Sequence, residues 1–202
     1  MVPFSLKNLE KIENFNIEII NSKENQFEIF SNIYKNYDSC FIFESLTGPK
    51  ELAETSLIGF DPLILIRCDT KYFKVIDSKN KTIIINDKVT EPLHQLRLIF
   101  NKLVDSKKNI APITYRYMGG AVGYVSYDAI RYWEKLPKPK KKILNFPLIE
   151  LGLFTDGILY DHIKKNAYYF YTNDKQHSRF DEIDKIINEK NPGKTKKSIE
   201  FN

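Results

Sequence analysis

The sequence predicts an α+β fold of largely antiparallel sheets with flanking helices. Segments with the alternating, β-branched and aromatic composition of strands outnumber the segments with helical periodicity. Most neighbouring strand segments are joined by short polar turns rather than by long helical crossovers. Short connections of this kind favour antiparallel pairing over a βαβ winding.

The first helix is expected at residues 25–37. Aromatic side chains recur there at helical spacing, and Asn21 with Glu24 can cap its start. The sequence FIFES, residues 41–45, then alternates as a strand.

Four further strand segments follow FIFES. Pro62 marks a bend between the first two, because proline cannot donate to a central ladder. The polar loop 77–81 joins the last two in the pattern of a hairpin. The four segments span residues 56–61, 63–68, 72–76 and 82–85.

The second helix begins near residues 90–92, where a capping hydroxyl, an early acid and an early proline coincide. Its spacing directs five apolar residues inward: Leu93, Leu96, Ile99, Phe100 and Leu103. After residues 115–137, a hairpin is expected from 148–160 to 167–171. A last helix, residues 178–189, is expected to bury Phe180, Ile183, Ile186 and Ile187.

The net charge of +5 comes from two lysine-rich segments, residues 135–142 and 190–197. The rest of the chain is slightly acidic, so we expect no basic groove and no nucleic-acid partner. No apolar stretch approaches the ~20 residues of a membrane span. The N-terminus lacks the features of a signal peptide. We therefore expect a cytoplasmic protein that does not enter the membrane.

The cysteines and histidines indicate no metal site and no catalytic constellation. The spacing of Cys40 and Cys68 fits no zinc or thioredoxin pattern, and we expect both as reduced core residues. The three histidines are scattered along the chain.

Residues 118–137 are the most unusual stretch by composition. They contain three closely spaced glycines, Gly119, Gly120 and Gly123. The stretch matches neither phosphate-binding glycine pattern, so we expect the glycines to let a strand pass close to another backbone. Charged residues follow at a spacing of three and predict a ladder of ion pairs along a short helix: Asp128, Arg131 and Glu134.

FIFES places a carboxylate on an apolar strand. Glu44 shares a face with Cys40 and Ile42, whereas Phe41, Phe43 and Ser45 share the other. An ionised carboxylate in apolar surroundings is costly without a partner. The residues alone favour an ion pair with a core Lys or Arg, or a strand end in solvent. They leave open a ligand that carries an ammonium group.

Four stretches in this order resemble the N-terminal part of anthranilate synthase component I, over about residues 25–175. They are FIFES, SLIGFDP (56–62), GGAVGYVSYDAIRYWEKLP (119–137) and FPLIELGLFTDGILYDH (146–162). That family makes anthranilate and pyruvate from chorismate with glutamine-derived ammonia and Mg2+. The reaction is the first step committed to tryptophan, which inhibits it by feedback.

The resemblance also implies roles for individual residues. The family's tryptophan-site segment L-L-E-S stands here as residues 42–45, so Glu44 and Ser45 are implied to bind tryptophan. The glycine-rich motif is implied to be structural and is shared with aminodeoxychorismate synthase component I. The motif stands here at Gly119, Gly120, Gly123, Tyr124, Asp128 and Arg131.

The resemblance implies a regulatory domain at residues 1–190 and a linker at 191–202 toward a catalytic domain that is not in this sequence. No catalytic residue and no cofactor are expected in this segment, which should be inactive alone, and Mg2+ is expected in the catalytic domain. The implied partners are tryptophan and the glutamine amidotransferase subunit, component II. Two alternatives are the same domain of aminodeoxychorismate synthase and a stand-alone amino-acid-binding module.

Overall fold

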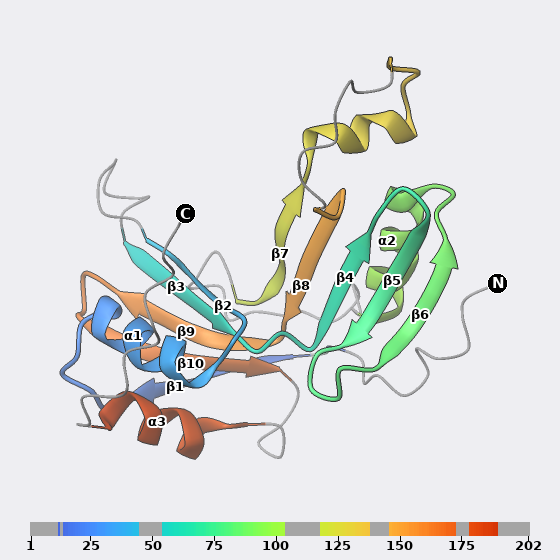
Figure 1. Ribbon diagram of the computed structural model, residues 1–202. Coiled ribbons are helices and arrows are strands. Elements are labelled where there is room, and N and C mark those ends of the chain that lie inside the picture. Colours follow the sequence, from blue (N-terminus) through green and yellow to red (C-terminus); the bar gives the residue numbers. More distant parts are fainter. Residues whose placement is uncertain are drawn as a thin grey trace. The chain divides into compact units, whose positions relative to one another are not determined.

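The computed structural model of the chain describes six stretches and divides the chain into two compact units (Figure 1). The α1/α3 unit comprises residues 14–61, 111–119 and 155–202, and the α2 unit comprises residues 1–13, 62–110 and 120–154. The expected domain boundary at 190–191 lies outside the described residues. The described residues are 12, 14–44, 54–103, 118–137, 146–172 and 178–189.

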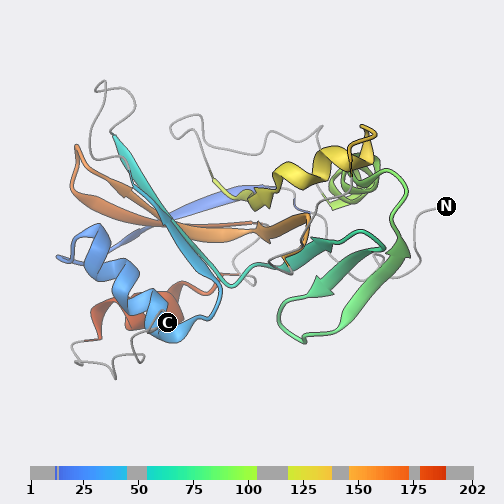
Figure 2. The same cartoon turned by 45° about the horizontal axis from the view of Figure 1, so that its top comes forward.

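The α1/α3 unit contains an antiparallel sheet in the order β1-β10-β9-β3-β2. Helices α1 (Gln26–Asn36) and α3 (Phe180–Asn188) lie on the same face of this sheet (Figure 2). The strands are β1 (Phe15–Ile20), β2 (Cys40–Phe43), β3 (Thr55–Phe60), β9 (Asp156–Asp161) and β10 (Asn166–Thr172). Strand β1, which the sequence analysis did not predict, pairs with β10 along its whole length.

Two clusters of apolar side chains cover the two faces of this sheet, because side chains alternate along each strand. The helix-side cluster joins both helices to the sheet and includes Ile29, Ile33, Ile58, Phe60, Tyr169, Ile183 and Ile187. The opposite cluster consists of Leu57, Met118, Leu159 and Phe170. The last predicted helix is therefore confirmed, with Phe180 and Ile186 partly buried against the helix-side cluster.

Helix α1 begins later than its predicted cap. Asn25, rather than Asn21 with Glu24, is the N-cap: its side chain accepts from the backbone of Phe27 and Glu28, while Glu28 accepts from Asn25 N. This reciprocal pattern is a capping box, and it satisfies two N–H groups at the start of the helix. The helix buries its isoleucines, and Phe27 is exposed.

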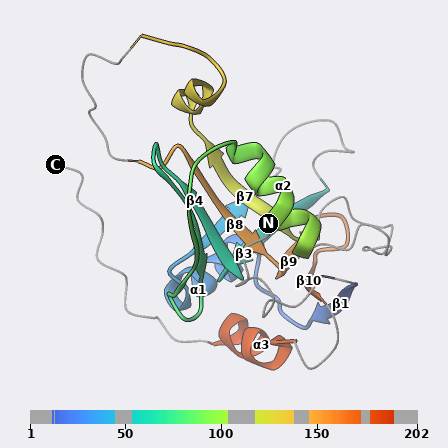
Figure 3. The ribbon, with the colours of Figure 1, turned by 90° about the vertical axis from the view of Figure 1, so that its right-hand side faces the viewer.

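The α2 unit contains a second antiparallel sheet, in the order β6-β5-β4-β8-β7, with α2 (Pro92–Leu103) beside it (Figure 3). Leu96, Ile99 and Leu103 are buried as predicted, whereas Leu93 is exposed. A short 3-10 helix, η2 (Tyr127–Tyr132), follows β7. The strands are β4 (Ile64–Cys68), β5 (Tyr72–Asp77), β6 (Ile83–Lys88), β7 (Gly120–Val125) and β8 (Ile149–Phe154).

The α+β class and the antiparallel sheets are confirmed, as is the hairpin β5–β6. The predicted strand 148–160 is wrong as a single element, because it breaks at Thr155 into β8 and β9, which belong to different sheets. In the sequence only the polar pair Thr155-Asp156 marks this break. None of the described helices combines the length and apolar character that a bilayer span requires.

Candidate functional site

Glu44 directly follows β2, the edge strand of the α1/α3 sheet. Cys40 and Ile42 pack against the helix-side cluster, and Phe41 packs against the opposite cluster. This confirms the predicted alternation. Glu44 is half-buried, and by the same alternation it belongs to the face that carries α1.

The recorded partner of Glu44 is a neutral amide. Gln26 Nε2, on the first residue of α1, donates to Glu44 Oε1 at 2.8 Å. Among the described residues no lysine, arginine or histidine forms an ion pair with Glu44. The ion pair that the residues alone favoured is therefore not found in the described part of the chain. Ser45, the other implied tryptophan-binding residue, lies outside the described residues.

The glycine-rich motif forms an edge strand with a close backbone approach. A Cβ atom on Gly123, whose φ is +157°, would lie 2.0 Å from the carbonyl oxygen of Glu150 on β8, closer than real Cβ atoms come. Gly119 and Gly120 also have positive φ. Tyr124 Oη donates to the carbonyl oxygen of Pro147 at 3.2 Å. The prediction that a strand passes close to another backbone is confirmed.

The charged residues after β7 form one ion pair rather than a ladder. Arg131 Nε lies 3.1 Å from Asp128 Oδ1. Arg131 Nη1 donates to the carbonyl oxygen of Pro137 at 2.7 Å, and within the described ranges no contact with Glu134 is recorded. The helix ends at Tyr132, so Glu134 does not continue its spacing. Arg131 thus connects η2 with the segment that follows it, in a different unit from Glu44.

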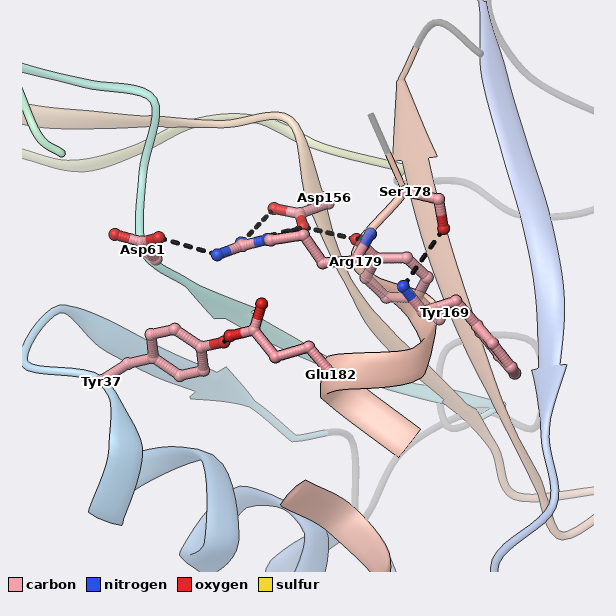
Figure 4. A network of polar contacts seen from close by, with 8 residues as sticks. Tyr37, Asp61, Asp156, Tyr169, Ser178, Arg179 and Glu182 are labelled. Atoms are coloured by element: carbon pink, nitrogen blue, oxygen red, sulfur yellow. Dashed lines mark hydrogen bonds and ion pairs between the residues drawn. The ribbon is translucent and has the colours of Figure 1, made fainter. Parts of the chain in front are cut away.

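A buried polar network in the α1/α3 unit was missed by sequence reasoning (Figure 4). Arg179 donates three hydrogen bonds to Asp156, at 2.9 to 3.0 Å, and one to Asp61 at 2.7 Å. Tyr169 Oη donates to Asp156 Oδ2 at 2.6 Å. Nearby, Tyr37 Oη donates to Glu182 at 2.6 Å and ties the end of α1 to α3.

Burial sets the electrostatics of this network. It raises the pKa of the Asp156 carboxyl, against the opposing effect of the Arg179 guanidinium. Burial alone would lower the pKa of Arg179, but Asp156 outweighs it and the net direction is upward. A carboxylate and a guanidinium that satisfy each other leave little capacity for a ligand, so we interpret the network as structural. The sequence signal was Asp156 itself, an acid inside the apolar run FTDGIL.

Two further contacts involve reactive side chains. Cys40 and Cys68 are free thiols, and Cys68 Sγ lies 3.2 Å from Tyr132 Oη. His162 Nε2 lies 2.8 Å from the buried hydroxyl of Ser56. In the described part of the chain, no three or more His, Cys, Asp or Glu side chains are grouped as a metal ion would need.

Comparison with known proteins identifies a family. The family model described as chorismate binding enzyme matches residues 38–201. The matched range includes β2, the glycine-rich motif and the buried network.

Proteins named anthranilate synthase are similar along most of the chain. Anthranilate synthase component 1 of Methanothermobacter thermautotrophicus is 30% identical over 166 residues, which are 82% of this chain and 32% of that protein. The chloroplastic anthranilate synthase alpha subunit 1 of Arabidopsis thaliana is 30% identical over 63% of this chain and 22% of its own length. The chain thus spans about a third or less of the length of these relatives.

Among solved structures, anthranilate synthase component I from Streptococcus pneumoniae aligns with a TM-score of 0.46 and 18% identity. The alignment covers 71% of this chain and 29% of that one.

Proposed function

Because the chain belongs to the family of chorismate binding enzymes, we propose that it forms the N-terminal, regulatory part of an anthranilate synthase component I. The relatives of that name, which align over most of the chain, support the proposal. The complete cytoplasmic enzyme acts as a lyase that converts chorismate and glutamine-derived ammonia into anthranilate and pyruvate, on the route to tryptophan.

In this proposal residues 1–190 form the regulatory domain and residues 191–202 lead to a catalytic portion. In the proposal, that portion binds chorismate and Mg2+. The chain alone is then inactive, and a glutamine amidotransferase subunit supplies the ammonia.

The regulatory assignment depends on one observation: Glu44 is half-buried, and its recorded partner is the neutral amide of Gln26. The amide brings no positive charge to this partly desolvated surface, where an ion pair is stronger than in water. A ligand ammonium can neutralise the carboxylate with a charge-assisted hydrogen bond. In the proposal Glu44 accepts from the ammonium of tryptophan, and Ser45 hydrogen-bonds its head group.

Feedback inhibition follows from differential affinity. Tryptophan inhibits if it binds more tightly to the arrangement of the complete enzyme in which chorismate binds poorly. The same linkage requires chorismate to weaken tryptophan binding by the same factor.

The first test is anthranilate formation by this chain joined to a catalytic portion of the family, followed by product fluorescence with increasing tryptophan. Glu44→Gln and Ser45→Ala should each raise the tryptophan concentration for half-inhibition by at least about tenfold, as expected for a hydrogen bond to a charged group. Glu18→Gln, a carboxylate on β1 of the same sheet, is the matched control and should leave inhibition unchanged.

Three outcomes would count against the proposal or redirect it. Unchanged inhibition in both site variants would remove the assignment of this site. Aminodeoxychorismate as the product would move the chain to the folate branch. Micromolar binding of tryptophan to the 202-residue chain alone, measured by calorimetry, would favour a stand-alone binding module.

A further inference from the structure

Gln26 is a buried polar side chain whose recorded contact is with Glu44. The residue is only 9% exposed, although first residues of helices commonly face solvent. A buried amide is costly unless it is hydrogen-bonded. Its Nε2 meets this need at Glu44, which is 18 residues away in the sequence and on another element.

The backbone of Gln26 is fixed by its neighbours. Asn25 and Glu28 form the capping box at the start of α1, with hydrogen bonds of 3.0 to 3.1 Å on either side of Gln26. Ile29 and Ile33 anchor the same helix in the helix-side cluster. The amide is therefore presented to Glu44 from a rigid support, which is the condition for holding a side chain in one orientation.

The chemistry of the donor decides what the carboxylate can bind. A lysine or arginine at position 26 would neutralise Glu44 internally. An amide orients the carboxylate through Oε1 and leaves its charge uncompensated. Glu44 Oε2 takes no recorded hydrogen bond from any described residue, and one oxygen thus stays available to a cation.

We infer that Gln26 is the positioning residue of the Glu44 carboxylate and thereby sets the preference of the site for ligands with an ammonium group. This inference rests on the proposed function, since it concerns the same site. Gln26 acts through Glu44 and does not itself contact the ligand.

The test uses the 202-residue chain and NMR titrations with two tryptophan analogues, each of which keeps one of the two charged groups of the amino acid. Tryptamine keeps the ammonium without the carboxylate, and indole-3-propionate keeps the carboxylate without the ammonium. Gln26→Met, which keeps the volume and removes the donor, should weaken tryptamine binding by about tenfold. Binding of indole-3-propionate should stay unchanged.

Two further variants separate positioning from a general structural role. Gln26→Asn keeps the amide but withdraws it by one methylene, and it should behave like Gln26→Met. Glu44→Gln combined with Gln26→Met should bind tryptamine no more weakly than Glu44→Gln alone, because the two residues act as one unit. Equal weakening of both ligands, or independent effects in the double variant, would overturn the inference.

A ligand-free measurement keeps this inference distinct from the proposed function. Side-chain NMR relaxation should show Glu44 ordered in the wild-type chain and mobile in Gln26→Met and Gln26→Asn. If Glu44 stays equally ordered in the variants, the positioning role is wrong, whatever binds. A second outcome is that Glu44 becomes mobile in the variants, while neither the wild-type chain nor the complete enzyme binds or is inhibited by tryptophan or tryptamine. In that case the proposed function is wrong, and the ligand preference inferred for the site is wrong with it.

Discussion

Replacing Arg179 by methionine should destabilise the α1/α3 unit by about 3 kcal/mol at neutral pH. Methionine keeps much of the apolar stem but removes all four recorded donor contacts to Asp156 and Asp61. Asp156, which is 7% exposed, then retains the hydroxyl of Tyr169 as its recorded side-chain donor. A buried carboxylate thus loses its cation.

The magnitude follows from the burial of the partners. Removing one member of a buried ion pair costs about 3–5 kcal/mol, since the other charge is left uncompensated. The Arg179 side chain is 26% exposed, so solvent screens part of this cost and the lower end applies. The Asp61 side chain is 40% exposed, and a screened pair of this kind contributes only about 0–1 kcal/mol.

The assay is urea denaturation followed by far-ultraviolet circular dichroism. Asp61→Asn is the matched control and should cost less than about 1 kcal/mol. The double variant Arg179→Met/Asp156→Asn should be more stable than Arg179→Met alone, because no unpaired charge remains. A loss below about 1 kcal/mol in Arg179→Met, or additive losses in the double variant, would refute the account.

Three further predictions concern single positions. Gly123→Ala should lower the free energy of unfolding by about 3 kcal/mol in the same assay, because the added Cβ collides with the backbone of β8. The control Ala121→Ser, at an exposed position of the same strand, should lower it by less than about 0.5 kcal/mol, and equal losses in the two variants would contradict the clash. Tyr132→Phe should cost about 1 kcal/mol through loss of its hydrogen bond to the carbonyl oxygen of Asp69, and a neutral result would remove that role. Burial raises the pKa of Asp156, so its stabilising contribution is complete below the ordinary value of 3.8 and is lost as the pH rises through the folded value. Urea titrations should therefore show the wild-type chain losing stability relative to Asp156→Asn from about pH 4 upward, and a rise would contradict this sign.

Local signals predicted much of the fold but not where the chain changes sheets. The polar loop 77–81 separates two β-rich runs and gave the hairpin correctly. By contrast, only the polar pair Thr155-Asp156 separates β8 from β9 in the sequence, and their pairing partners place the two strands in different sheets. Strand β1 was missed because Glu18 interrupts a segment whose other residues are mostly half-buried.

The candidate site shows the same limit. Alternation along FIFES correctly put Cys40 and Ile42 on the face opposite to Phe41, and it indicated that the Glu44 carboxylate needs a partner. It could not identify Gln26, since a glutamine at the start of a helix looks like a solvated residue until the strand packs beside it. The buried network is harder still, because Arg179, Asp156 and Asp61 come from separate elements and meet only in the folded unit.

The pairing of β1 with β10 has a consequence for how the chain is made. Residues 15–20 are hydrogen-bonded to residues 167–172, so the first strand leaves the ribosome long before its neighbour exists. Contacts between such distant residues are slow to form, since a long loop must close first. Until residue 172 has been synthesised, the backbone N–H and C=O groups of β1 that pair with β10 stay open to pairing with other chains. Chaperone demand during translation should therefore be highest late in synthesis and should fall once β10 has emerged.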